Sequence, residues 1–296
     1  MACNAAMSTS VPISVVIAAH DEEPVIGRCL EALLHAARPD EIEIVVVCNG
    51  CTDQTAAIAR GYGANVGVIE TPRPSKTAAL NVGDARVTGF PRFYVDADVT
   101  LPLASVRRIA ARLRDGDALA ASPVMELDLR GSSGAVRAYY GVWRRLPYVR
   151  EGMMGVGVYA LSEEGRRRFD AFPDVIADDG YVRMLFGADE RARVDDAPVR
   201  VYAPEGLADL VRIKTRSRLG RYQLRQRFPD LHARERAAKS YRSAGSTILV
   251  RPWLWPAALV YAAVLVETRR RARRQAASLE DYVWERDGSS RSADRR

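Results

Sequence analysis

Two carboxylates one residue apart follow an apolar run in residues 93–98 (FYVDAD). This pattern predicts a buried strand that ends at the rim of a sheet, with Asp96 and Asp98 at its carboxyl end. Open α/β sheets bind ligands at that end, and carboxylate oxygens are the ligands that hard divalent cations prefer. The alternative is that both acids only close the strand in a turn, because Asp is a common turn residue.

A second acidic pair, Asp178 and Asp179, precedes an apolar segment that predicts a helix. Adjacent acids at a helix start can simply stabilise its positive end. They can also do chemistry, because two like charges in a partly buried place raise one of the two pKa values and make that carboxylate a better base.

Composition is that of a globular protein with one large or two small domains. The chain has 296 residues, 48% of them hydrophobic, and a formal net charge of +7. Arginine is frequent from Arg137 onward, which leaves nucleic acid, anionic lipid and phosphorylated substrates open as partners. The spacing of Cys48 and Cys51 suits a redox or zinc motif, but no second Cys or His pair accompanies it in the sequence. We therefore expect no redox or metal role for the two cysteines.

The elements that must position the acids alternate between strand and helix. Apolar runs at 11–19, 42–48 and 66–70 predict strands, and 76–86 predicts the helix that leads to the strand before Asp96. Four such alternations in under a hundred residues predict an α/β fold with a mostly parallel sheet. Further on, residues 101–114 predict a helix and 118–124 another strand.

Four segments, in this order and spacing, resemble the donor-site motifs of family 2 glycosyltransferases with the GT-A fold: 16–23, 47–53, 76–83 and 96–98. The resemblance covers most of residues 14–225. It implies a GT-A type nucleotide-diphospho-sugar transferase fold, in which helices flank a mostly parallel central sheet. It also implies a nucleotide-diphosphate sugar as donor and Mn²⁺ or Mg²⁺ as cofactor.

By this resemblance, the loop that contains Ala18, His20 and Glu22 holds the nucleotide base and ribose together with the turn at Asn49. Asp53 either contacts the donor or caps the helix that follows it. We expect His20 to shape the loop and not to act in catalysis. Where the family usually has two acids, this chain has Cys48-Asn49. Asn can both donate and accept, so this residue does not specify the base. A UDP-sugar is the expected donor, and a GDP-sugar is the alternative.

The resemblance also implies that Asp98 ligates the cation and that Asp96 supports the ribose or the metal. Lys76 is either a diphosphate contact or a solvated lysine at a helix start. Position by position, Asp179 would be the general base and Asp178 its neighbour.

Two arginines, Arg216 and Arg218, match the arginines of the family's Gln-Arg-x-Arg-Trp segment and are suited to a departing diphosphate. The Gln and Trp of that segment are absent, which argues against processive polymer synthesis.

Residues 137–145 predict a helix rich in aromatic and Arg residues, in the region where the family builds its acceptor site. These rings either bind the acceptor or belong to a core or a membrane contact. The glycine cluster in 152–157 precedes a predicted strand and does not follow one, so it is not a dinucleotide loop.

Residues 253–266 are apolar for about fourteen residues between groups of arginines. A bilayer span needs roughly twenty, so we predict an interfacial helix led by two tryptophans. A buried core helix and a true span are the alternatives. The first ten residues lack the apolar core of a signal peptide, and we expect the protein in the cytoplasm, at the cytoplasmic face of the cell membrane.

The predicted organisation is a flexible N-terminus (1–10), a catalytic domain (11–230), a C-terminal helical segment at the membrane (231–286) and a disordered tail (287–296). The catalytic domain divides into a donor half (11–100) and an acceptor half (101–230). The predicted function is inverting transfer of a sugar to a hydroxyl acceptor, lipid-linked or in the cell envelope, with no nucleic-acid partner. A nucleotidyltransferase of similar fold and a non-catalytic nucleotide-sugar binder are the alternatives.

Overall fold

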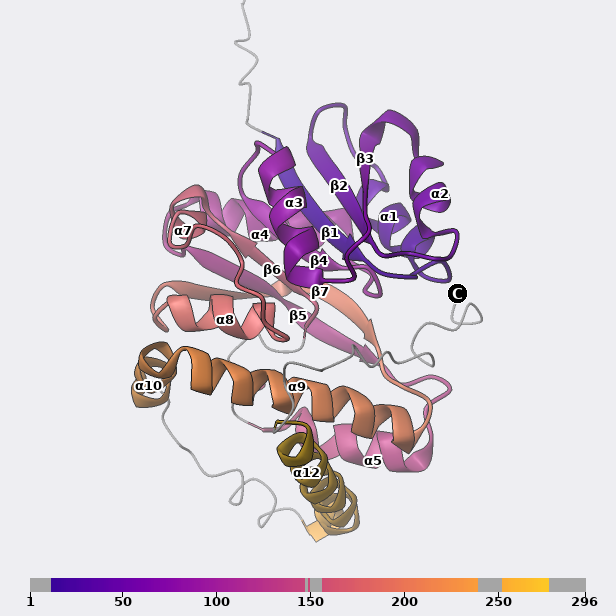
Figure 1. The fold of residues 1–296 in the computed structure, drawn as a ribbon, viewed down its shortest axis with the longest axis vertical. Coiled ribbons are helices and arrows are strands. Elements are labelled where there is room, and N and C mark those ends of the chain that lie inside the picture. The colour runs from indigo at the N-terminus through magenta and orange to yellow at the C-terminus, as the bar shows by residue number, and fades with distance from the viewer. Residues whose placement is uncertain (1–11, 147–148, 150–155, 239–251, 277–296) are drawn as a thin grey trace, which may run out of the picture.

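The computed structural model describes residues 12–146, 149, 156–238 and 252–276 (Figure 1). Seven strands form one sheet in the order β3-β2-β1-β4-β6-β5-β7. Within the described residues, β6 is the strand that runs antiparallel to its neighbours β4 and β5, and the other pairs are parallel. The strands are β1 (Ile13–Ala19), β2 (Ile42–Asn49), β3 (Val66–Thr71), β4 (Arg92–Asp96), β5 (Ala120–Asp128), β6 (Val158–Leu161) and β7 (Arg191–Tyr202).

Helices cover both faces of the sheet. They are α1 (Ile26–Leu34), α2 (Thr55–Arg60), α3 (Lys76–Arg86), α4 (Leu103–Arg114), α5 (Gly134–Trp143), α7 (Glu163–Arg166), α8 (Asp178–Leu185), α9 (Leu207–Arg227), α10 (Pro229–Ala238) and α12 (Trp255–Gln275). The short 3₁₀ helices η1 (Gly63–Asn65) and η2 (Pro252–Leu254) join their neighbours.

Strand β1 shows why the sheet is covered on both sides. Val15 and Ile17 pack into a core that includes α1, α2 and α4. Val16 points the other way, into a core that includes α3 and α8. Because successive side chains of a strand alternate between faces, a continuous apolar run is what a strand buried on both faces requires. Figure 1 shows these two helical layers on either side of the sheet.

The predicted elements of the donor half are confirmed. The strands predicted at 11–19, 42–48 and 66–70 are β1, β2 and β3, and the helix predicted at 76–86 is α3 with the same bounds. In the acceptor half, α4 and β5 are present, and β5 runs four residues beyond the predicted end at residue 124. The sequence did not predict β7, because the adjacent acids Asp195 and Asp196 and then Pro198 interrupt its alternation of apolar and polar residues.

A third core lies at the end of the molecule away from β3, where α5, α9 and α12 pack together (Figure 1). Helix α12 buries Val264, Thr268 and Ala272 in this packing. The bounds of the helix predicted at 253–266 differ from those of α12, which begins at Trp255 and continues to Gln275. The arginines between 269 and 274 extend the helix and do not follow it, because Arg is a good helix former.

No helix among the described residues combines the length and the hydrophobicity that crossing a membrane requires. The predicted flexible N-terminus (1–10), the predicted tail (287–296) and parts of the predicted C-terminal segment lie outside the described residues.

Candidate active site

Acids from two segments of the chain meet at the carboxyl ends of the central strands, and Lys76 from a third segment joins them. Its Nζ lies 2.6 Å from Oδ1 of Asp96 at the end of β4 and 2.9 Å from Oδ1 of Asp178 at the start of α8. Burial alone would lower the pKa of Lys76, but the charges of Asp178 and Asp96 outweigh it and hold the pKa above its usual value. The two acidic motifs of the sequence therefore belong to one site.

Local structure explains how Lys76 and Asp96 reach this place. The Ser75 side chain caps α3 by accepting from the Ala78 N–H, which makes Lys76 the first residue of the helix. Strand β4 pairs with β1 so that Asp96 lies beside Ala18. The Asp96 N–H donates to the Gly157 carbonyl at 2.8 Å.

Gly157 is required by this approach. Its φ is +72°, and a Cβ there would lie 2.7 Å from a Val99 methyl group and 3.2 Å from the Asp96 carboxylate. Only glycine adopts this conformation without strain and also lets the backbone come so close. Part of the glycine cluster noted in the sequence thus shapes the acidic site.

The two acids of the second pair have different surroundings. Asp178 is buried, at 3% exposure, and its Oδ2 accepts a hydrogen bond of 3.0 Å from the Tyr159 hydroxyl while its Oδ1 meets Lys76. Asp179 is only partly buried and accepts the Gly180 N–H at 2.7 Å. Burial, and then the charge of Asp178, raise the pKa of Asp179. Asp178 is thus the carboxylate fixed by the protein, and Asp179 is the one whose affinity for a proton is increased.

Tyr159 had no signal in the sequence that pointed to this role. It lies on β6, is buried, and stacks on Tyr94 with ring centroids 5.0 Å apart. Burial and the charge of Asp178 raise its pKa well above its usual value. The phenol therefore stays protonated and donates to Asp178.

Helix α9 packs closely against the residues that precede the acid pair. A Cβ on Gly220 would lie 2.8 Å from the Ala177 Cβ, and the Gln223 side chain accepts from the Ile176 N–H at 2.8 Å. Arg216 lies one helical turn before Gly220 and therefore on the same face of α9.

Arg218 lies elsewhere on α9, since two residues separate it from Arg216 and a helix turns about 100° per residue. Burial, Arg221 and, more weakly, Arg269 of α12 lower the pKa of Arg218. Arg216 is thus on the side of α9 that meets the residues before the acid pair, and Arg218 is on another side. That the two arginines bind a departing diphosphate stays a prediction.

The loops after β1 and β2 lie at the same edge of the sheet as the acids. His20 Nδ1 is 2.6 Å from the Asn49 carbonyl, and the Asn49 side-chain amide donates to the Ala19 carbonyl at 2.7 Å. Asn49 is buried, at 3% exposure, so in this structure its side chain connects β1 to β2. That it contacts a nucleotide base stays a prediction.

Asp53 makes local hydrogen bonds of the kind that the capping alternative predicts, and its contact with a donor stays a prediction. Its Oδ1 accepts from the Thr55 N–H at 3.0 Å, at the start of α2, and its Oδ2 accepts from the Glu23 N–H at 3.1 Å. Glu22 is buried beside it, and the Glu22 N–H donates to the Thr55 hydroxyl at 2.7 Å. These bonds hold the loop that begins at His20 against the turn after β2, while Ala18 of the predicted loop lies within β1.

The residues at the end of β4 fit a hard divalent cation. Asp98 and Asp96 offer carboxylate oxygens, the donor set that Mg²⁺ and Mn²⁺ favour. Negative charge is concentrated there: burial first, and then Asp98, Asp96 and Glu22, raise the pKa of the Cys29 thiol beneath them to about 12.

The aromatic helix predicted at 137–145 is α5, and its rings belong to the core. Tyr139, Tyr140 and Trp143 are buried, and Tyr139 stacks on Tyr261 of α12 at 5.2 Å. Lys214 of α9 lies 4.4 Å from the centre of the Trp143 ring, and burial, with a smaller effect from Arg221, lowers its pKa to about 7. These rings therefore join α5, α9 and α12, which favours the core alternative over acceptor binding.

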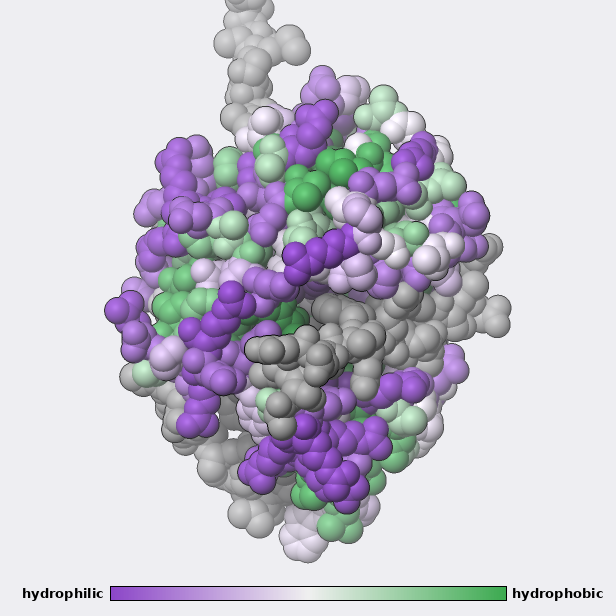
Figure 2. All heavy atoms as spheres, in the orientation of Figure 1, coloured by the Kyte–Doolittle hydropathy of each residue, from purple (hydrophilic) through white to green (hydrophobic). Residues whose placement is uncertain are grey.

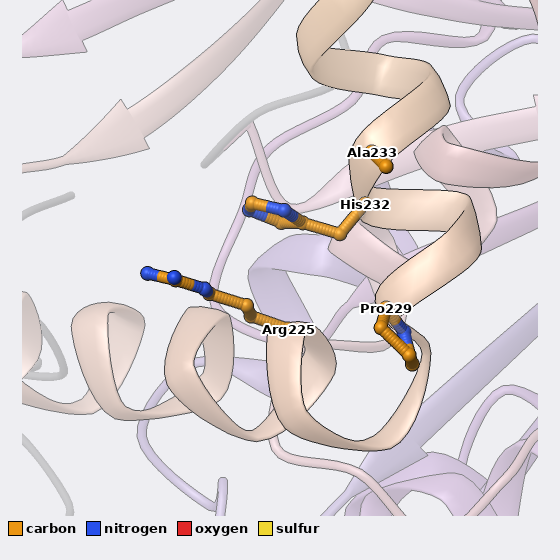
Figure 3. Close-up of a pocket in the computed structure, with 4 residues that line it drawn as sticks. All are labelled: Arg225, Pro229, His232 and Ala233. Carbon is orange, nitrogen blue, oxygen red and sulfur yellow. The ribbon is translucent and has the colours of Figure 1, made fainter.

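A cavity of about 350 Å³ lies at the junction of α9 and α10. Figure 3 shows that the Arg225 and His232 side chains extend into it side by side, with Pro229 and Ala233 at its wall. None of the acids described above lines it, so the chemistry of the site is not located there.

A mostly parallel seven-stranded sheet with acids at the carboxyl ends of its central strands defines an α/β domain of the GT-A class. Residues 14–152 match the family model Glycosyl transferase family 2. Residues 14–152 are therefore similar to that family. Its sequence is 32% identical over 177 residues to 4,4'-diaponeurosporenoate glycosyltransferase of Staphylococcus aureus, a match that covers 55% of this chain and 42% of that protein. The chain thus spans less than half the length of this relative.

Solved structures of glycosyltransferases share the fold. A mannosyltransferase from Pyrobaculum calidifontis, in complex with GDP-mannose and Mn²⁺, superimposes with a TM-score of 0.60 and 22% identity over 92% of this chain and 81% of that one. Glucosyl-3-phosphoglycerate synthase from Mycobacterium tuberculosis, in complex with Mn²⁺, UDP and glucosyl-3-phosphoglycerate, gives a TM-score of 0.54 and 22% identity over 73% of this chain and 80% of that one. At these identities the likeness establishes the fold.

Proposed function

We propose that this protein is an inverting glycosyltransferase that transfers a sugar from a nucleoside diphosphate sugar to a hydroxyl acceptor. The observation that carries the proposal is the convergence of Asp96, Lys76 and Asp178 at one edge of a sheet within a family 2 domain. The solved relatives are complexes with GDP-mannose or UDP and Mn²⁺, which supports a donor of this class.

In the proposed mechanism, Asp179 accepts the proton of the acceptor hydroxyl as its oxygen attacks the anomeric carbon. Its raised pKa suits this role, because a base with a higher pKa has a greater driving force for proton transfer. Asp178 does not take the proton, since Lys76 and Tyr159 already hold both of its oxygens. It positions the start of α8, and with it Asp179.

The departing diphosphate needs positive charge. When bound, a divalent cation on Asp98 and Asp96 would supply Lewis-acid neutralisation of that charge. Lys76, which lies between Asp96 and Asp178, would hold a diphosphate oxygen through the third of its N–H donors. Arg216, on the face of α9 that meets the acid pair, is the second protein cation suited to this.

Thermal unfolding with a panel of UDP-, GDP- and dTDP-sugars in the presence of Mn²⁺ tests the donor without knowledge of the acceptor. A donor at a hundred times its Kd stabilises the fold by about 2.7 kcal/mol. Asp98→Asn should abolish the Mn²⁺-dependent part of the shift, while Asp115→Asn, an exposed acid after α4, should keep it. An undiminished shift in Asp98→Asn would remove the metal assignment.

Product analysis separates this function from the alternatives. A glycosyltransferase releases nucleoside diphosphate, a nucleotidyltransferase releases pyrophosphate, and a binding protein releases neither.

We further propose that α12 rests on an anionic membrane surface. Beside the face that packs on α5 and α9, this helix exposes large apolar side chains: Trp255 is 54% exposed, Leu259 74% and Val266 63%, and Trp253 before it 70%. Exposed arginines follow at 269–271, 273 and 274. Figure 2 shows hydrophobic and hydrophilic residues side by side at this end of the molecule. An apolar face next to arginines matches the boundary between acyl chains and anionic headgroups.

Sedimentation with anionic vesicles tests this contact. Trp255→Ser with Leu259→Ser should lower the bound fraction several-fold, and salt should weaken binding of the parent. Leu207→Ser, at an exposed leucine of α9 that is 42% exposed, is the matched control. Equal sedimentation of the double variant and the parent would exclude α12 as the contact.

A further inference from the structure

The loops after β1 and β2 bring together three side chains of the kind that bind soft metal ions. One ligand atom each from His20, Asp21 and Cys51 lies within 4.8 Å of the other two. In the sequence, the Cys48-x-x-Cys51 motif lacked a second pair of ligands. Because Ala19 and Cys48 are paired across parallel strands, the fold places His20-Asp21 beside this motif, about thirty residues away along the chain.

Hydrogen bonds already hold the three side chains in place. The Thr52 N–H donates to Oδ1 of Asp21 at 2.5 Å, and the Asp21 N–H donates to the Cys51 sulfur at 3.4 Å. With Nδ1–H of His20 donated to the Asn49 carbonyl, the lone pair of the imidazole is on Nε2. Metal-binding histidines usually donate their other ring nitrogen in this way.

The donor set differs in kind from that of Asp96 and Asp98. Sulfur, imidazole nitrogen and a single carboxylate favour Zn²⁺ over Mg²⁺ or Mn²⁺, which prefer oxygen. The Cys51 thiol lies 3.5 Å from the Ala19 carbonyl, to which it donates its proton. A bound cation would displace that proton. All three residues are partly exposed, so solvent can reach them.

We propose that His20, Asp21 and Cys51 form a binding site for a zinc-class divalent cation, separate from the carboxylate site at Asp98. The three protein ligands leave a fourth tetrahedral position to solvent. Binding releases one proton, from the Cys51 thiol. The site lies in the loops that the family resemblance predicts to hold the nucleotide base. A consequence that rests on the proposed function is that this cation and the sugar nucleotide exclude each other.

The first experiment uses the full-length, reduced, metal-free protein and no donor. Titration with Co²⁺ should produce the absorption of a thiolate-bound tetrahedral ion with a stoichiometry of one. Zn²⁺ should remove that absorption, and competition with a chromophoric chelator gives its Kd. Cys51→Ser and His20→Gln should each weaken Zn²⁺ binding at least about tenfold.

Matched controls are Cys29→Ser, a cysteine buried in α1, and His35→Gln, an exposed histidine at the end of α1. Both should bind Zn²⁺ as the parent does, and thermal unfolding confirms that each variant is folded. Absence of the thiolate band, or equal Zn²⁺ affinity in Cys51→Ser and the parent, overturns the site. The site is also overturned if Cys48 and Cys51 are recovered as a disulfide under the reducing conditions of the titration.

The second experiment measures Zn²⁺ affinity with and without UDP- or GDP-sugar and Mg²⁺. Mutual weakening is expected. If Zn²⁺ binds through Cys51 and the donor does not affect it, the exclusion is refuted and the metal site is retained. If no sugar nucleotide binds at all, the proposed function fails, while the Co²⁺ result still decides the metal site.

Discussion

The two acids at the start of α8 should respond in opposite ways to the same substitution. In Asp178→Asn, the buried side chain loses its charge, while Lys76 Nζ at 2.9 Å and the Tyr159 hydroxyl at 3.0 Å still point at it as donors. Lys76 meets Oδ1 and Tyr159 meets Oδ2, and an amide keeps an oxygen at only one of these two positions. Its NH₂ group would then face a donor.

The loss of unfolding free energy in Asp178→Asn follows from the burial of this side chain. Breaking a buried ion pair by removing one partner costs about 3–5 kcal/mol, but Lys76 keeps its second partner, Asp96, at 2.6 Å. We therefore expect Asp178→Asn to lose about 2–4 kcal/mol of unfolding free energy. For a protein of this size, that lowers Tm by roughly 4–16 °C.

Asp179→Asn should not be destabilised in this way. Its raised pKa means that the folded protein disfavours the charged carboxylate, so a neutral amide removes an unfavourable charge. Donor affinity should persist, while transfer falls by about a hundredfold or more because the amide cannot take the acceptor proton.

The assay compares Tm at pH 7, donor affinity by calorimetry and turnover for both variants. The reasoning is refuted if Asp178→Asn keeps the parental Tm, or if Asp179→Asn stays active while Asp178→Asn does not. Activity in both variants would place the base elsewhere.

Three further outcomes are expected. Because a base acts only when deprotonated, kcat/KM should rise with pH through the raised pKa of Asp179 and be lost as pH falls through it. This change should occur above the ordinary Asp pKa of about 4. A plot of kcat/KM against pH that is flat down to about pH 4 would contradict this. Arg216→Ala should lower kcat at least about tenfold and Arg218→Ala by less than about threefold, since the two lie on different sides of α9; equal losses in steady-state assays would argue against the assigned faces. Gly220→Ala should cost up to about 2 kcal/mol in thermal unfolding, as overpacking of about 1–3 kcal/mol outweighs the gain in helix propensity of about 1 kcal/mol. Gly141→Ala in α5, where a Cβ would meet nothing within 4 Å, should instead stabilise the protein, and the same sign for both substitutions would refute the packing argument.

The sequence by itself determined the elements that local patterns specify. Continuous β-branched runs predicted β1 and β2, and the segment 76–86 predicted α3, because strand and helix patterns depend on residues close in the chain. It also placed Asp96 and Asp98 at a strand end. The family motifs added the roles, which stay proposals for Asp98 and Asp179.

Tertiary structure decided which of these residues meet. Lys76 could have been a solvated lysine; only the packing of α3 and α8 on one face of the sheet places it between Asp96 and Asp178, the second of these about a hundred residues away. The same holds for Arg216 and Arg218, two residues apart in one motif but separated by the turn of α9, and for Cys51, to which the pairing of β1 with β2 brings His20 and Asp21. The physical reason is that hydrophobic periodicity and capping are local, whereas charge pairing across a sheet depends on strand register and on how closely helices approach, which no single stretch of sequence encodes.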